Sequence, residues 1–259
     1  IFMGTMLEKS GVAEDLLHTL QLLMRRVPGG LAIAVTVLGT IMAATTGIVG
    51  ASVIMLTLIA LPVMLAKGYD KALSVGTIAS AGTLGILIPP SIMLVIMGDL
   101  VGVPVGTLFT GAILPGLLMS ALYIVFILLA CLFFPKLAPA VTGALGPSDE
   151  RVTAALMFKS FLPPALLIVL VLGSIFAGWA TPTEASGVGA LGAILLAIGN
   201  RRLSMSVLRG VMSSAALTNA MVFFIIFGAT LFSYVFRALG GDDVVHDILK
   251  ASGIDTGWE

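Results

Sequence analysis

From Gly30 to Ala66 the sequence contains no charged side chain, and this run constrains the fold more than any other feature. A spanning helix needs about 20 apolar residues to cross roughly 30 Å of hydrocarbon, whereas a single helix over this run would be roughly 54 Å long. The run must therefore fold back on itself. Its centre, AATTGIVGAS (Ala43 to Ser52), lacks the Asp, Lys, Trp or Pro typical of a turn that reaches headgroups or water. We predict a re-entrant hairpin over 29–66, whose tip stays at membrane depth and is covered by protein or lines a cavity.

The composition places the rest of the chain in a bilayer as well. Of 259 residues, 59% are hydrophobic and only 10% are charged, whereas a soluble domain carries about 25% charged residues. The 13 Lys and Arg balance the 13 Asp and Glu, so the charge gives no argument for a nucleic-acid partner. The single cysteine, Cys131, allows neither a disulfide framework nor a cysteine metal site. Because the sequence opens on Ile1 and stops after GIDTGWE, we expect a fragment of a longer protein.

A second interruption follows the polar turn KGYDK (Lys67–Lys71). The segment 72–98 is long enough to cross once, but GTLGILIPPS (Gly82 to Ser91) breaks its hydrogen-bond ladder with two glycines and tandem prolines. We predict a discontinuous transmembrane helix in an all-α polytopic membrane protein. We expect residues 1–10 to be the end of an upstream span and residues 135–160 to be a loop. Interfacial amphipathic helices are expected at 11–28 and 241–259. The other transmembrane helices are expected at 107–134, 161–178, 184–200 and 211–237.

The basic residues predict the orientation. If the hairpin returns to its own side and the other segments cross once, only Arg237 and Lys250 fall on one side of the membrane. The opposite side receives the other eleven: Lys9, Arg25, Arg26, Lys67, Lys71, Lys136, Arg151, Lys159, Arg201, Arg202 and Arg209. Basic residues gather on the cytoplasmic side of membrane proteins. We therefore predict that the hairpin opens from the cytoplasm, that 11–28 and 135–160 are cytoplasmic, and that 241–259 is periplasmic.

The two interruptions, Thr45–Gly50 and Gly82–Ser91, lie in adjacent segments and can meet. The end of one half-helix exposes carbonyls that can ligate Na⁺, and the start of the next exposes N–H groups that attract an anion. Pro89 or Pro90 suits the first turn of the second half-helix. Neutral oxygens, the hard ligands that such a cation accepts, come from Thr45, Thr46, Thr83 and Ser91. The pattern predicts an ion and substrate site without a buried charge; the alternative is two kinks that allow close helix packing.

Other readings of the sequence are weaker. In TPTE, Thr181 at the N-cap, Pro182 in the first turn and Glu184 three residues on from Thr181 predict a capping box, which is a structural role. An intramembrane enzyme would need ionisable or nucleophilic groups within the spans, which carry essentially no Asp, Glu, His or Lys, so we expect no enzyme and no cofactor. A channel or a scaffold subunit is the alternative, although neither needs a re-entrant tip that faces a broken helix.

The order of several motifs resembles the large membrane subunit of the tripartite ATP-independent periplasmic (TRAP) transporters, in the branch labelled mannitol/chloroaromatic compound transport. The motifs cover essentially the whole chain: TTGIVGAS, LPVMLAKGYDKAL, SAGTLGILIPPSIMLVIMGD, LFTGAILPGLLM, GWATPTEAS and TNAMVFFIIFGATLFSYVF. The resemblance implies a multi-pass protein of the bacterial inner membrane that imports a small organic anion by alternating access. It also implies Na⁺ as the coupling ion, a small membrane subunit and a periplasmic substrate-binding protein as partners, and an elevator-type fold with inverted repeats.

The same resemblance implies site residues. The hairpin tip Thr46-Gly47 and the break Gly82-Thr83-Leu84-Gly85 would hold Na⁺, mostly through backbone oxygens, while Pro89, Pro90 and Ser91 would shape the break. Many family members carry a serine directly after the tip glycine, where this chain has Ile48. This difference shifts the expected side-chain ligands to Thr45 and Thr46. The second hairpin and second broken helix of the family would follow residue 259.

Overall fold

A computed structural model describes residues 1–24, 27–47, 49–139 and 154–251, without the side chains of Ala43, Thr45, Thr46 and residues 154–160. Within these ranges the chain is helical and contains no strand. Eleven α-helices and one 3₁₀ helix follow one another: α1 (Phe2–Lys9), α2 (Val12–Leu23), α3 (Gly30–Thr46), α4 (Val49–Ala66), α5 (Lys71–Thr83), η1 (Leu84–Ile86), α6 (Ile92–Val101), α7 (Val105–Phe133), α8 (Ala154–Phe176), α9 (Pro182–Gly199), α10 (Met205–Ala238) and α11 (Gly241–Ala251).

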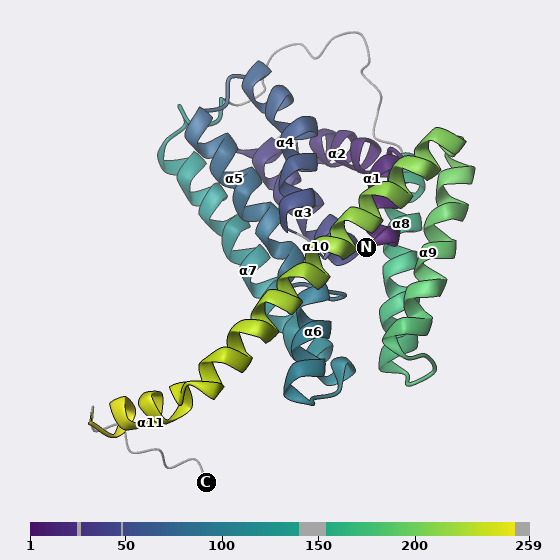
Figure 1. Ribbon diagram of the computed structural model, residues 1–259. Coiled ribbons are helices and arrows are strands. Elements are labelled where there is room, and N and C mark those ends of the chain that lie inside the picture. The colour runs from purple at the N-terminus through teal and green to yellow at the C-terminus, as the bar shows by residue number, and fades with distance from the viewer. Residues whose placement is uncertain (25–26, 48, 140–153, 252–259) are drawn as a thin grey trace. The chain divides into compact units, whose positions relative to one another are not determined.

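The chain divides into two compact units, Ile1–Met212 and Ser213–Glu259. In the first unit α3 is central and packs against α2, α4, α5 and α7, as Figure 1 shows. The helices α8 and α9 pack side by side, and α1 lies against α9. The second unit contains most of α10 and the amphipathic helix α11. An ion pair of 3.6 Å between the exposed side chains of Arg237 and Asp242 connects these two helices.

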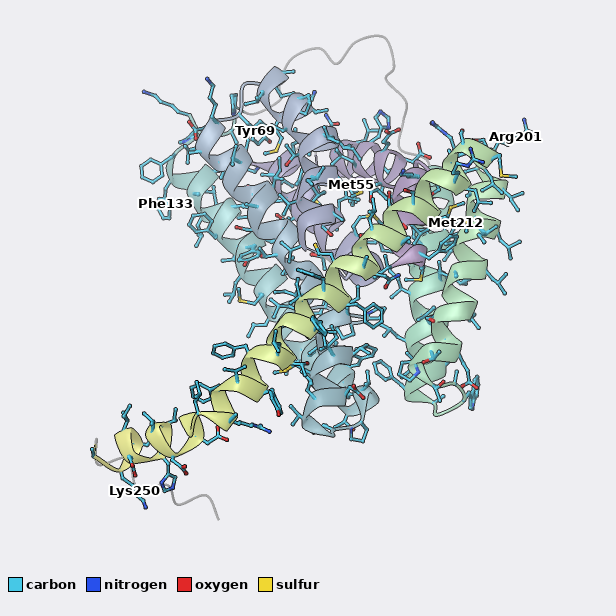
Figure 2. All side chains as sticks on the ribbon, in the orientation of Figure 1. Met55, Tyr69, Phe133, Arg201, Met212 and Lys250 are labelled. Atoms are coloured by element: carbon cyan, nitrogen blue, oxygen red, sulfur yellow. The ribbon has the colours of Figure 1, made fainter. Side chains whose placement is uncertain are left out.

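Four of the described helices are long and apolar enough to cross a membrane, namely Val49–Ala66, Val105–Phe133, Pro182–Gly199 and Met205–Ala238. Their outward surfaces are apolar, and Phe133 projects away from the end of α7 in Figure 2. A water-facing surface would not carry so many exposed aromatic and aliphatic side chains. The structure thus confirms an all-α polytopic membrane protein.

Several helices differ in extent from the sequence-based expectation. Helix α8 begins at Ala154 instead of 161, and α10 runs from Met205 to Ala238 instead of 211–237. Apolar content predicts the bounds of a membrane-crossing segment, but not those of a helix that continues into polar residues such as Ser206 and Arg209. Most of the expected loop 135–160 lies outside the described residues.

The predicted hairpin consists of α3 and α4, with Gly47 between them in a left-handed conformation (φ 62°). Its open end is closed by Tyr69, which follows α4 and is buried. The Tyr69 hydroxyl accepts a hydrogen bond of 3.2 Å from the backbone N–H of Leu31 at the start of α3. Burial raises the pKa of the Tyr69 phenol, so this group stays neutral. A single side chain therefore holds both arms of the hairpin together at their base.

Both arms pack closely on the last turns of α5, because small residues allow the backbones to approach. A Cβ atom added at Gly39 of α3 would stand 2.7 Å from the Cβ of Ala81. One added at Gly82 would stand 2.3 Å from Val53 Cγ2 and 3.1 Å from the backbone N and Cα of Val53 in α4. The hairpin and the first half of the broken helix therefore form one packed body.

Replacement of Gly82 by alanine should destabilise this body. The new methyl group meets the Val53 backbone, which cannot rotate away, so we expect a loss of about 1–3 kcal/mol in the free energy of unfolding. Thermal unfolding of the full-length protein in detergent measures the effect. The matched control is Gly76→Ala in the same helix, where an added Cβ meets nothing within 4 Å and the change should be neutral or stabilising. Equal midpoints for the two variants would contradict the close approach of α5 to α4.

Candidate functional site at the hairpin tip and the helix break

The break between α5 and α6 extends from Leu84 to Ser91. Helix α5 ends at Thr83, the 3₁₀ helix η1 continues to Ile86, and helical structure resumes at Ile92. Neither Pro89 nor Pro90 has a backbone N–H, and the peptide bond between them is cis. The helix is thus interrupted within an apolar segment, where backbone groups need other partners.

The tip of the hairpin lies directly on this break. A Cβ atom added at Gly47 would stand 3.2 Å from the backbone N of Ile92 and 3.3 Å from the carbonyl oxygen of Pro90. Gly47 is buried, so protein covers the tip, as an irregular backbone at membrane depth requires. Only glycine combines this close approach with a positive φ at low cost. The two interruptions that the sequence places about 40 residues apart are therefore neighbours in space.

Helix lengths explain why tip and break reach the same level. Both α4 and α5 adjoin the turn at residues 67–70. Helix α4 has 18 residues and spans about 27 Å. The 13 residues of α5 and the 3 of η1 together span about 26 Å. Two elements that start together and run equally far end at the same depth.

The predicted side-chain ligands are only partly described. The Thr83 hydroxyl donates a hydrogen bond of 2.7 Å to the carbonyl of Ser80, and the Ser91 hydroxyl donates one of 3.0 Å to the carbonyl of Ile86. Because each hydroxyl donates its proton to a backbone carbonyl, its lone pairs can bind a cation or accept another hydrogen bond. The side chains of Thr45 and Thr46 lie outside the description, so their assignment stays a prediction.

The break is enclosed on one side and open to a cavity on another. On α7, a Cβ added at Gly116 would stand 2.9 Å from Ile88 Cγ1 and 3.3 Å from the carbonyl oxygen of Leu87, so this helix closes over the break. Leu84 and Gly85 are buried. Elsewhere Pro90, Ser91 and Ile92 border a cavity of about 320 Å³, whose other walls come from α1, α7, α8 and α9. The arrangement offers backbone oxygens inside and a space of ligand size beside them.

The cavity includes residues that our sequence analysis did not assign to a site. Pro182 and Ser186 of α9 face it together with Phe109 of α7. No local signal marks Ser186 or Phe109 as part of a site, and Pro182 is marked only as part of a capping motif, because these residues reach the break only through tertiary packing. The motif at 181–184 itself forms a capping box: Glu184 Oε2 accepts from the Thr181 N–H at 2.8 Å, and the Glu184 N–H donates to Thr181 Oγ1 at 3.3 Å. The capping box starts the helix at the edge of this cavity.

The electrostatics of the break come from dipoles and not from charged side chains. Between Ala72 and Gly98 the sequence has no charged residue. The C-terminal end of α5 presents carbonyl oxygens, and the start of α6 presents N–H groups that no side chain caps. A helix carries roughly half a negative charge at its C-terminus and half a positive charge at its N-terminus. The dipoles therefore place partial negative charge near Thr83 and partial positive charge near Ile92.

A hairpin packed on a broken helix inside an all-helical membrane protein is an arrangement of secondary transporters. The chain belongs to the family described as "Tripartite ATP-independent periplasmic transporter, DctM component", whose profile matches residues 1–256. The resemblance to the large membrane subunit of TRAP transporters is thereby confirmed at the level of the family. The members of this family are permease subunits and not enzymes.

Several curated relatives of the chain are named as TRAP permease proteins. A C4-dicarboxylate TRAP transporter large permease protein of Pseudomonas aeruginosa is 34% identical over 233 residues, which are 90% of this chain and 53% of the relative. An isethionate TRAP transporter permease protein of Oleidesulfovibrio alaskensis is 32% identical, over 91% of this chain and 36% of the relative. An ectoine TRAP transporter large permease protein of Halomonas elongata is 28% identical, over 94% and 55%. The chain spans about half the length or less of these relatives.

Replacement of Gly47 by alanine tests the contact between tip and break. The methyl group must fit against the backbone of Pro90 and Ile92 while the residue keeps a positive φ, and the latter alone costs about 1–2 kcal/mol. The matched control is Gly102→Ala, because Gly102 has φ 71° but an added Cβ there meets nothing within 4 Å. We expect thermal unfolding of the full-length protein to show an additional loss of about 1–2 kcal/mol for Gly47→Ala. Equal losses would show that the tip does not touch the break.

Proposed function

We propose that this chain forms part of the large permease subunit of a Na⁺-coupled TRAP transporter, which imports a small organic anion by alternating access. The observation that carries the proposal is the contact of Gly47 at the hairpin tip with Pro90 and Ile92 at the helix break. This contact brings two irregular backbone segments together in apolar surroundings. A site of this kind binds ions and substrate with backbone dipoles.

Sodium would bind at the C-terminal end of α5. Carbonyl oxygens of Gly82, Thr83 and Gly85 and the hydroxyl oxygen of Thr83 are the candidate ligands on the break, and Thr46 and Gly47 are those on the tip. Oxygen ligands and the negative end of a helix dipole suit a hard monovalent cation. The Thr83 hydroxyl supports this role, because its proton is engaged by Ser80 and its lone pairs are oriented away from that bond.

The substrate would bind in the cavity beside Pro90, Ser91 and Ile92. The uncapped start of α6 favours an anionic group, because first-turn N–H groups and the helix dipole both attract one. The relatives are named for C4-dicarboxylates, isethionate and ectoine, each of which carries a carboxylate or a sulfonate group. A carboxylate or sulfonate is therefore the group that we assign to the start of α6.

The proposed transporter works with partners in the bacterial inner membrane. A periplasmic substrate-binding protein would deliver the anion, and a small membrane subunit would accompany the permease, as the family description implies. We propose that the hairpin opens from the cytoplasm, since the charge distribution of the sequence favours that side. The packed body of α3, α4 and α5 would move as an elevator against the other helices, because its tight contacts leave little freedom within it.

Thr83→Ala should lower the apparent affinity of the transporter for Na⁺, measured through uptake. The change removes one oxygen ligand, and loss of a contact with a charged group costs about 1.5 kcal/mol, which corresponds to roughly a tenfold higher Na⁺ concentration for half-maximal uptake. The measurement is uptake of a labelled C4-dicarboxylate, sulfonate or other organic acid into proteoliposomes that contain the full-length permease and its partners.

Thr110→Ala is the matched control for this experiment. Its hydroxyl also donates to a backbone carbonyl of its own helix, that of Gly106 at 2.9 Å, but Thr110 is exposed and does not line the cavity beside the break. The control should leave Na⁺ dependence unchanged. Identical Na⁺ curves for Thr83→Ala and the unmodified protein would remove the ion site from this position, and uptake without any Na⁺ requirement would favour a channel or scaffold role.

A further inference from the structure

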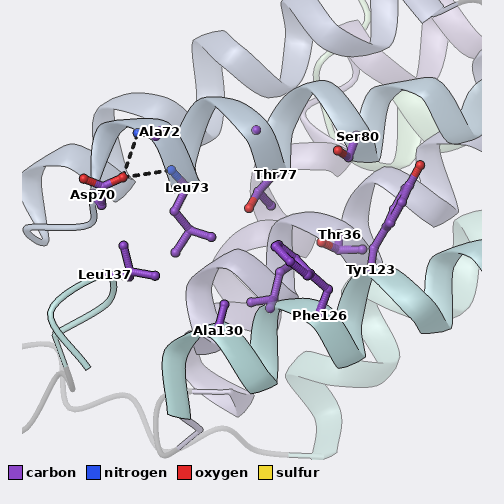
Figure 3. A pocket seen from close by; sticks show the side chains of 12 residues that line it. Thr36, Asp70, Ala72, Leu73, Thr77, Ser80, Tyr123, Phe126, Ala130 and Leu137 are labelled. Carbon is purple, nitrogen blue, oxygen red and sulfur yellow. Dashed lines mark hydrogen bonds between the residues drawn. The ribbon is translucent and has the colours of Figure 1, made fainter. Parts of the chain in front are cut away.

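A second cavity of about 360 Å³ lies between α3, α5 and α7, toward the open end of the hairpin and not at its tip (Figure 3). We name it the α5–α7 cavity. Its volume falls within the roughly 300–1,000 Å³ of ordinary ligand pockets. Its walls include Thr36, Leu73, Thr77, Tyr123, Ile127 and Leu137. The cavity is separate from the break, because none of its lining residues belongs to the segment Thr83–Ile92.

The walls of the α5–α7 cavity are mostly apolar, and its rim lies on the outer surface of the helices. Phe126 at the rim is 66% exposed, and Ala72 and Gly76 are exposed as well. Phe126 belongs to α7, which is long and apolar enough to span a membrane. An apolar opening in the side of a spanning helix is accessible to lipid hydrocarbon.

Among the described residues, one hydroxyl inside the cavity has no hydrogen-bond partner. Thr77 is 6% exposed, and its Oγ1 forms no hydrogen bond within the described part of the chain. Buried threonines elsewhere donate to their own helix, as Thr36 does to Ala32 at 3.1 Å. The Thr77 oxygen is instead turned toward the cavity in Figure 3. A buried hydroxyl without a partner is unfavourable, so the cavity suits a ligand that carries a hydrogen-bond acceptor.

Basic residues adjoin, in the sequence, the residues at the polar end of the cavity. The N–H of Asp70 donates to the carbonyl of Leu137 at 2.9 Å, which brings the start of α5 to the segment that follows α7. Lys71 and Lys136 are sequence neighbours of these two residues, and Lys67 lies in the same turn. None of these lysines forms an ion pair with another described residue. Asp70, the only acid of this turn, accepts N–H bonds from Ala72 and Leu73 at 2.9 and 3.0 Å. Three lysines against this one carboxylate leave an excess of positive charge.

The spacing of these groups matches the layers of a membrane leaflet. Thr77 lies six residues beyond Lys71 on α5, which is about 9 Å along the helix axis. The interfacial layer on each side of the hydrocarbon is roughly 5–8 Å thick. Lysines in the headgroup layer therefore place the Thr77 hydroxyl close to the level of the ester carbonyls, with the apolar walls beside it.

We propose that the α5–α7 cavity binds one anionic phospholipid. Its phosphate lies among Lys67, Lys71 and Lys136, one ester carbonyl accepts a hydrogen bond from the Thr77 hydroxyl, and one acyl chain fills the apolar space against α7. The lipid thereby joins the hairpin arm α3 and helix α5 to α7. The proposal depends only on the membrane location of the chain and not on the ion or substrate.

The test is native mass spectrometry of the full-length permease with its partners, released from detergent and titrated with phosphatidylglycerol or phosphatidylcholine. We expect one phosphatidylglycerol to bind more tightly than phosphatidylcholine. The double variant Lys71→Gln, Lys136→Gln should bind phosphatidylglycerol about 25-fold more weakly. Each lysine near an anionic lipid contributes about a fivefold gain in affinity, and the two effects multiply. Lys250→Gln on α11 is the matched control and should change nothing. Equal affinity of the double variant and the unmodified protein would overturn the headgroup assignment.

Thr77→Val tests the role of the hydroxyl, because it should raise the unfolding temperature without lipid and reduce the further increase that lipid causes. Valine has nearly the same shape but no hydroxyl, so without added lipid the variant should unfold at a higher temperature than the unmodified protein. The increase in unfolding temperature on addition of phosphatidylglycerol should in turn be smaller for the variant. Thr110→Val, whose exposed hydroxyl bonds to Gly106, is the control. An equal lipid-induced increase in Thr77→Val and in the control would overturn the proposal.

Discussion

The structure depends on one constraint, which is that backbone N–H and carbonyl groups within hydrocarbon need partners. Two segments of this chain leave α-helical geometry in apolar surroundings, at Gly47 and between Leu84 and Ser91. Each covers the other, and α7 covers the break from a further side through Gly116. The irregular backbone is thus tolerated because protein surrounds it, and the same enclosure leaves dipoles available to a ligand.

Glycine positions determine how closely these elements approach. Gly39 and Gly82 let the two arms of the hairpin contact the end of α5, while Gly47 lets the tip contact the start of α6. The hydrogen bond from Leu31 to Tyr69 fixes the other end of the hairpin. Contacts at base, middle and tip prevent the hairpin from sliding along α5, so the level of the tip follows from the helix lengths. In the proposed mechanism this rigidity makes ion and substrate move together.

Much of this arrangement could be predicted from sequence, because it rests on local signals. The charge-free run from Gly30 to Ala66 with small residues at its centre predicts a hairpin, and tandem prolines after Gly85 predict a break. Tertiary contacts left no such signal. The start of α8 at Ala154, the approach of α9 to the break and the unpaired Thr77 hydroxyl all depend on packing between distant segments. From the sequence alone, Thr77 would be expected to donate a hydrogen bond to the backbone of its own helix, as threonines in helices commonly do.

The absence of charged side chains from Ala72 to Gly98 has a consequence for how a coupled transporter could work. A buried carboxylate would need compensation whenever the ion leaves, which penalises every empty state. Helix dipoles and hydroxyls carry only partial charge, so an empty site costs less and can cross the membrane at the end of a cycle. For a singly charged anion, a site with one Na⁺ at the end of α5 and the anion at the start of α6 is close to neutral overall. A site with only one of the two keeps a full charge in a medium of low dielectric constant, which is unfavourable. A symporter requires that the site moves across the membrane either with both ion and substrate bound or with neither. In the proposed mechanism this coupling follows from the opposite partial charges at the two ends of one broken helix.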